Sequence, residues 1–176
     1  MPSVETDLSF PKITHSVSKH SMRRSQRGAL VDRGANGGII GNDARVTHTH
    51  IRTVVVTGID NHELNSLHIV DASAYVHTHL GPVIVILRQH AYHGIGTSIH
   101  SSGQIEWFKH RAHDQSHVVQ GLQMIHAQEG YVIPIDIIHG LPHIKMCPNT
   151  DEEFETLPHV LLTEGNDWDP SVLDHN

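Results

Sequence analysis

Three long runs of apolar and β-branched residues follow one another with only short turns between them. The runs are His50–Ile59, Ser66–Thr78 and Val83–Tyr92, and the turns between them carry Gly, Pro, Asp and Asn. Such runs suit strands, and Ser66–Thr78 alternates between apolar and polar residues as a half-buried strand does. Because no helical segment separates the runs, we expect them to pair as an antiparallel meander. The sequence therefore predicts a mainly β protein.

The composition limits the classes of partner. The 176 residues are 38% hydrophobic but only 5% aromatic, so the core of what we expect to be one domain rests on Val, Ile and Leu. The formal net charge of −7 argues against direct nucleic-acid binding. A single cysteine, Cys147, excludes an intrachain disulfide. Since neither a secretory signal nor a membrane-spanning run is visible, we expect a cytoplasmic protein with no membrane partner.

The chain divides by composition into four parts. They are a polar leader that we expect to be disordered (1–28), a main β domain (29–116), a small β extension (117–146) and an acidic tail or linker (147–176). Within them, Thr97–Asp114 predicts one short helix. Gly130 is expected at the tip of a hairpin, and Pro134 restricts its strand to an edge or a bulge.

A short apolar run ends in Asp32 and leads at once into the glycine-rich segment RGANGG. Two carboxylates that share one proton can activate a water molecule and polarise a peptide carbonyl, and glycine lets two such loops approach closely. The chain carries one such loop, so the second carboxylate would come from an identical chain across a two-fold axis. The alternative is an ordinary glycine-rich turn after an edge strand.

Several segments in the same order resemble one protein family. ALVDRGANGGIIGNDARV resembles the active-site segment of the retropepsin-like aspartic proteases of copia-type LTR retrotransposons, which carry hydrophobic–Asp–Ser/Thr–Gly–Ala there. Gly81–Trp107 is similar to that family's later strand, loop and helix, and Glu129–Ile144 to the start of its pre-integrase region. LPHV and WDPSVLD also resemble parts of such polyproteins, so the resemblance covers about residues 20 to 174.

The resemblance implies a retropepsin-like closed barrel with one short helix over residues 29–116, followed by the β extension. It also implies a homodimeric aspartic endopeptidase that processes a polyprotein, with a peptide substrate and without a cofactor or metal. Asp32 of each chain would be catalytic, and Gly34 and Ala35 would shape the active-site loop. The hairpin around Gly58 and Ile59 would be the flap over the substrate, although the segment also fits an ordinary hairpin.

Arg33 departs from the family pattern, because the family carries Ser or Thr at this place. In the family the hydroxyl bonds across the dimer, and a guanidinium lacks an acceptor. A guanidinium near the two carboxylates would also favour their ionised forms. Two hypotheses therefore stay open, an active protease and a non-catalytic, retrotransposon-derived β domain.

Nineteen histidines offer a third hypothesis, a metal-binding β domain. Three pairs stand close together: His48 and His50, His77 and His79, and His90 and His93. Residues at i and i+2 on a strand face the same side, so two such pairs could chelate Zn, Ni or Cu. The alternative is that the histidines are scattered surface substitutions. The glycine-rich stretches lack the Gly-x-Gly-x-x-Gly and P-loop patterns of phosphate-binding loops.

Overall fold

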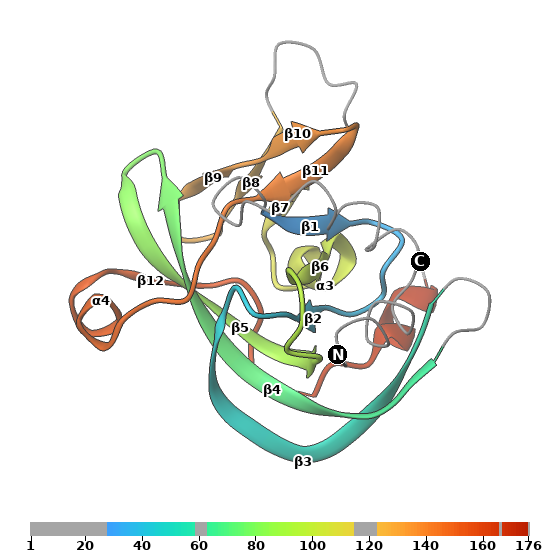
Figure 1. Cartoon of the computed structure of the whole chain (residues 1–176). Helices are drawn as coiled ribbons and strands as arrows, with labels where there is room; N and C mark the ends of the chain where they lie inside the picture. The colour runs from blue at the N-terminus through green and yellow to red at the C-terminus, as the bar shows by residue number, and fades with distance from the viewer. Residues whose placement is uncertain (1–27, 59–62, 115–122, 166, 176) are drawn as a thin grey trace.

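The structure is a computed structural model that describes residues 28–58, 63–114, 123–165 and 167–175 (Figure 1). Its strands are β1 (Ala29–Asp32), β2 (Ile39–Ile40), β3 (Arg45–Thr57), β4 (Glu63–Thr78), β5 (Gly81–Tyr92), β6 (Ile99–Ser101), β7 (Arg111–His113), β8 (Met124–His126), β9 (Val132–Pro134), β10 (Asp136–Ile138), β11 (Leu141–Ile144) and β12 (His159–Leu161). Two short α-helices, α3 (Ser102–Trp107) and α4 (Asp151–Thr156), and the 3₁₀ helix η4 (Pro170–His175) accompany them.

The strands form two sheets. The larger has the order β10-β11-β1-β6-β2-β5-β4-β3, with β12 paired to β5 beside this path, and the smaller has the order β7-β8-β9. In Figure 1, β6 and α3 lie near the centre of the view, between β1 and the curved β3–β4–β5 ribbon. The prediction of a mainly β protein is confirmed.

The predicted meander is the longest continuous part of the larger sheet. β3 and β4 pair antiparallel from Arg45↔Ser73 to Thr57↔Glu63, with register shifts along the way. β4 and β5 pair antiparallel down to Thr78↔Gly81, where Gly81 has a φ of +109°. β5 is buried along most of its length, which agrees with its position between β4, β2 and β12.

The main core lies between the ribbon, β1 and α3. Its fully buried members come from both halves of the chain and include Ala29, Val31, Ile40, Val85, Leu87, Ile105, Ile125, Ile133, Ile144 and Leu162. Because the expected β extension and the expected tail both contribute side chains, the described parts of the chain share one core. As expected from the composition, aliphatic residues rather than aromatic ones fill it.

The expected closed barrel is not found. β10 and β3 lie at opposite ends of the larger sheet's order and do not pair with each other in the described part of the chain. β10 has 3 residues and β3 has 13, so β10 offers too few backbone groups to close the sheet against β3.

The helix predicted across Thr97–Asp114 is much shorter in the structure. Only Ser102–Trp107 is helical, because Ile99–Ser101 pairs with β1 and Arg111–His113 pairs with β8. The Ser101 hydroxyl caps the helix by accepting a hydrogen bond from the Gln104 amide. A second helix, α4, begins with a capping box between Thr150 and Glu153.

The expected acidic tail is folded onto the sheet. β12 pairs parallel with β5, from His159↔Ile84 to Leu161↔Ile86, and Val160 and Leu162 are fully buried. In the expected extension, β11 pairs with β1, so it continues the larger sheet. The leader up to residue 27 lies outside the described residues.

Two local predictions about the smaller sheet are confirmed. Gly130 lies in the turn between β8 and β9 with a φ of +99°, a conformation that favours glycine. Pro134 lies on β9, an edge strand of that sheet. Within the described residues, no helix is long and apolar enough to cross a lipid bilayer.

Two histidines lie beside each other in the core. His90 on β5 and His100 on β6 are almost completely buried, and their ring centroids are 6.0 Å apart. Burial disfavours the charged imidazolium and lowers the pKa of His90 to about 4, against the opposing effects of the Arg88 carbonyl and Asp71. Burial, together with His90, lowers the pKa of His100 to about 3.

Acid is therefore expected to destabilise the fold. Both folded pKa values lie below the unfolded value. The stabilisation that the two neutral rings provide is therefore fully present above about pH 6.5 and decreases as the pH falls. Between about pH 7 and about pH 5, the free energy of unfolding should decrease by about 2 kcal/mol for each buried imidazole. Urea unfolding at the two pH values measures this change.

Two variants test the assignment to buried rings. His100→Leu removes one titrating group and should reduce the pH dependence of the unfolding free energy. His48→Gln, at an exposed position of β3, should leave that dependence unchanged. A pH dependence in H100L equal to that of the native chain would contradict the assignment.

Candidate functional site

Asp32 is carried to the surface by a buried strand. Ala29, Leu30 and Val31 are buried because β1 lies between β11 and β6, and Asp32 is the first partly exposed residue of the strand. β1 runs parallel to β6, with Asp32 opposite Ser101. The carboxylate therefore lies at the end of β1, beside the point where β6 leads into helix α3.

The loop after Asp32 holds the carboxylate in place. The Gly34 amide donates a hydrogen bond to Asp32 Oδ1 at 2.8 Å, and the Ala35 amide donates to the Asp32 carbonyl at 3.3 Å. A Cβ on Gly34 would lie 3.2 Å from Asp32 Oδ1, so a larger residue would crowd the carboxylate. Glycine at this position lets the loop turn tightly around the acid.

Helix α3 and the residue before it support the same loop. The Ser101 hydroxyl donates to the Ala35 carbonyl at 2.8 Å while it caps the helix. The Gly38 amide donates to Gln104 Oε1 at 3.0 Å. The loop is thus bonded at Ala35 to the last residue of β6 and at Gly38 to helix α3.

The Arg33 side chain is directed at acids of its own chain. Its guanidinium donates to both carboxylate oxygens of Glu106, at 2.8 and 3.1 Å, and to Asp114 Oδ1 at 3.1 and 3.2 Å. These partners, Glu106 foremost, raise the pKa of Arg33 above its usual value. Asp114 is buried and also accepts a hydrogen bond from Ser102. The sequence predicts this charge near the carboxylate pair and gives no sign that Glu106 and Asp114 are its partners.

The candidate flap is a hairpin, as the sequence predicts. β3 ends at Thr57, Gly58 follows it, and Thr57 pairs with Glu63 at the start of β4. Ile59 lies outside the described residues.

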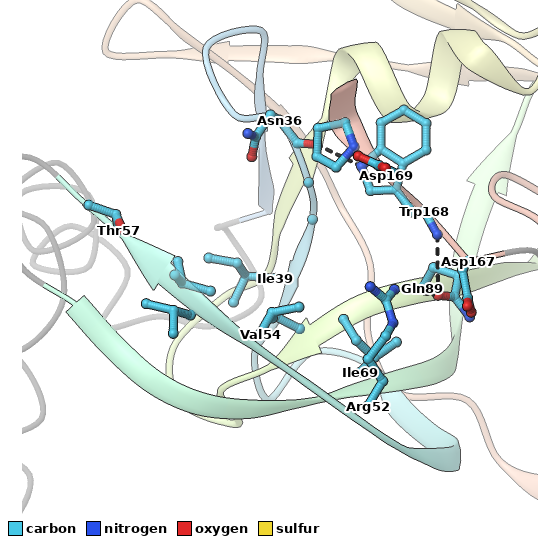
Figure 2. A pocket seen from close by; sticks show the side chains of 16 residues that line it. Asn36, Ile39, Arg52, Val54, Thr57, Ile69, Gln89, Asp167, Trp168 and Asp169 are labelled. Atoms are coloured by element: carbon cyan, nitrogen blue, oxygen red, sulfur yellow. Dashed lines mark hydrogen bonds between the residues drawn. The ribbon is translucent and has the colours of Figure 1, made fainter. Parts of the chain in front are cut away.

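A pocket of about 620 Å³ lies between the Asp32 loop and β3 (Figure 2). One wall is the loop and β2, from Asn36 to Ile39, and the opposite wall is β3 from Val54 to Thr57. The apolar side chains of Ile39, Val54 and Ile69 line it together with polar ones such as Arg52 and Gln89, so its surface is mixed (Figure 2). Asp32 is not one of the lining residues, but the loop that begins at Asp32 is one wall.

Three residues of the site were not singled out as such from the sequence. Gln89 and Gln104 are buried polar residues that join the loop to β5, and Trp168 closes one side of the pocket. All three lie in segments that carry the family resemblance. Their roles depend on contacts between distant segments, for which the sequence gives no signal.

The histidine pairs do not converge on one site. The His48 ring lies edge-on to His50, and His50 Nε2 is 3.0 Å from Asp71 Oδ1. His79 Nδ1 accepts a hydrogen bond from the Val132 amide, and His90 is in the core. Throughout the described ranges, no group of three or more His, Cys, Asp and Glu residues is arranged to hold a metal ion.

Comparison of the chain with protein-family models, curated proteins and solved structures finds no match. The geometry of the site therefore carries the functional conclusions that follow.

Removing Arg33 is expected to destabilise the fold because it leaves Asp114 buried without its cationic partner. Arg33→Met should lower the free energy of unfolding by about 2 kcal/mol or more. Glu106→Gln, which removes the more exposed partner, should cost less than about 1 kcal/mol. Urea unfolding measures both.

The double variant Arg33→Met/Asp114→Asn is the control for this explanation. It removes the buried charge together with its partner and should recover most of the lost stability. If R33M is no more destabilised than E106Q, the ion pair between Arg33 and Asp114 does not hold the loop to the end of β7.

Proposed function

We propose that this chain is one subunit of a homodimeric aspartic endopeptidase of the retrotransposon type. The position of Asp32 carries the proposal. A buried strand, parallel to the strand that leads into α3, ends in a partly exposed carboxylate held by a glycine loop. The adjoining pocket under the β3–β4 hairpin is a second support, since it is where the family resemblance expects a peptide.

In this proposal two copies of Asp32 approach across a two-fold axis and share one proton. The ionised carboxylate takes a proton from a water molecule as the water oxygen attacks the carbonyl carbon of the peptide. The protonated carboxyl transfers its proton to the carbonyl oxygen, which becomes a hydroxyl in the tetrahedral intermediate. Proton transfer to the amide nitrogen then lets the C–N bond break, and the two products carry a new carboxyl and a new amine.

The arrangement around Arg33 bears on whether this chemistry runs. Two carboxylates within 3.2 Å compensate the guanidinium charge, which reduces its effect on a nearby pair of Asp32 carboxylates. This supports an active site. Arg33 carries no hydroxyl, and the same contacts turn its guanidinium toward its own chain, so the position offers no replacement for the family's bond across the dimer. That observation favours the second candidate function, a non-catalytic β domain derived from such a protease.

The pocket surface suggests the kind of peptide. Its lining combines the apolar residues Ile39, Val54 and Ile69 with polar ones such as Arg52 and Gln89, so we expect an extended peptide that carries both an apolar and a polar side chain near the scissile bond. A peptide that spans a polyprotein junction is the natural substrate class.

Cleavage of such a junction peptide tests the proposal. The assay compares the native chain, Asp32→Asn and the double variant Arg33→Ser/Asp114→Asn between about pH 4 and about pH 7. In the double variant, Asp114→Asn removes the carboxylate that Arg33→Ser alone would leave buried and unpaired. We expect the native chain to cleave, D32N to lose about 100-fold or more, and the double variant to be faster than the native chain.

Two controls define the result. Asp136→Asn, on the edge strand β10, should keep native activity. The activity per chain should rise with chain concentration, because two chains build one site. Cleavage that survives in D32N would contradict the role of Asp32. If neither the native chain nor the double variant cleaves the peptide, the endopeptidase proposal is contradicted. The non-catalytic β domain is then the remaining candidate function.

A further inference from the structure

Trp168 contacts the Asp32 loop from the far end of the chain. Its indole Nε1–H donates a hydrogen bond of 2.7 Å to the carbonyl of Asn36, 132 residues earlier. The ring is buried, and its centroid lies 6.2 Å from that of Phe108, just beyond α3. The bond therefore ties the middle of the glycine loop to a residue of the C-terminal segment (Figure 2).

This bond belongs to a network of hydrogen bonds beside the pocket. The Trp168 amide donates to Gln89 Oε1, at 3.4 Å. The Gln89 carbonyl accepts from Gln104 Nε2 at 3.1 Å, and Gln104 Oε1 accepts from the Gly38 amide at 3.0 Å. The network begins at the Asn36 carbonyl and ends at the Gly38 amide. It therefore holds the loop at two positions that are two residues apart.

The network also reaches β3, the strand that leads into the candidate flap. Arg52 on β3 donates to Gln89 Oε1 at 2.9 Å, the same oxygen that accepts from Trp168. Gln89 has a φ of +64°, an uncommon conformation for a residue other than glycine. The carboxamide of Gln89 thus joins the hairpin, the C-terminal segment and β5 at one place.

The segment that precedes Trp168 is anchored to the larger sheet. β12 anchors the preceding segment to β5. Just after β12, the Thr163 hydroxyl accepts from the Arg88 amide and donates to the Arg88 carbonyl, both at 2.6 Å. Trp168 therefore arrives at the loop from a segment that the larger sheet holds on both sides of Leu162, whose amide donates to the Ile86 carbonyl at 3.0 Å.

The composition of the loop explains why such a contact matters. Three of the five residues from Gly34 to Gly38 are glycine, and glycine leaves the backbone free to adopt many conformations. A loop of this kind needs external bonds to hold one geometry. The carbonyl of Asn36 is one of the groups through which those bonds act, beside the Ala35 carbonyl and the amide and carbonyl of Gly38.

We propose that Trp168 is a positioning residue that holds the Asp32 loop in its working geometry through the Asn36 carbonyl. In its catalytic consequence the inference rests on the proposed function, and in its structural part it does not. The working unit then extends from β1 to at least Trp168, beyond the boundary at residue 116 that the sequence indicated.

Hydrogen exchange of the native chain, Trp168→Phe and Trp107→Phe tests the structural part. W168F keeps an aromatic ring and loses the N–H donor. W107F removes the same donor from the half-exposed neighbour, whose ring centroid is 6.5 Å away. In W168F we expect the Gly38 amide to lose protection about five- to tenfold, with the β4–β5 amides unchanged. W107F should match the native chain at Gly38.

Cleavage of the junction peptide tests the catalytic part on the same variants. We expect W168F to lower kcat about fivefold or more with KM near the native value, because the loop carries Asp32 and the substitution leaves the peptide's contacts in place. W107F should keep the native kcat.

Several results would overturn the proposal. They are unchanged protection at Gly38 in W168F, an equal loss across the β4–β5 amides, or a raised KM with native kcat, which would make Trp168 a substrate contact. Faster cleavage by W168F would make it an obstruction of the pocket. If neither the native chain nor the double variant of Arg33 and Asp114 cleaves, the proposed function fails, and the exchange measurement still decides whether Trp168 positions the loop.

Discussion

The parallel pairing of β1 with β6 sets the position of every group at the candidate site. It places Asp32 opposite Ser101, the residue that ends β6, caps α3 and bonds the Ala35 carbonyl. The helix then directs Gln104 toward Gly38 and Glu106 toward Arg33. If this pairing were lost, the carboxylate, its loop and the support of the loop would separate together.

The same compact arrangement sets a limit on acid conditions. A shared proton between two carboxylates works best in weak acid, whereas the buried pair His90 and His100 makes folding less favourable there. The His90 ring packs so closely on Gly38 that a Cβ at this glycine would lie 2.3 Å from the ring. Protonation of His90 would therefore place a charge directly beside the loop. The chemistry and the stability of the fold therefore favour different parts of the pH range.

Local patterns in the sequence predict the local parts of this structure. Alternation and β-branched runs predict β3, β4 and β5, Gly130 predicts a hairpin tip, and Pro134 predicts an edge strand. The sequence does not reveal the partners of Arg33, which lie 73 and 81 residues further along the chain. The apolar residues of Thr97–Asp114 fit a helix and two short strands equally well, and only pairing with β1 and β8 separates them. Acidic residues around α4 concealed the three-residue strand β12, because a strand that short leaves little periodicity to detect.

The central claim is that Asp32 of two chains forms one site, and ligand binding tests it most directly. The ligand is a junction peptide in which a hydroxyl-bearing tetrahedral carbon replaces the scissile carbonyl, since this group imitates the intermediate that two carboxylates would hold. Titration calorimetry gives both its affinity and its stoichiometry. The account predicts one peptide for two chains and a large loss of affinity in Asp32→Asn. One peptide for each chain, or equal affinity in D32N, would contradict it.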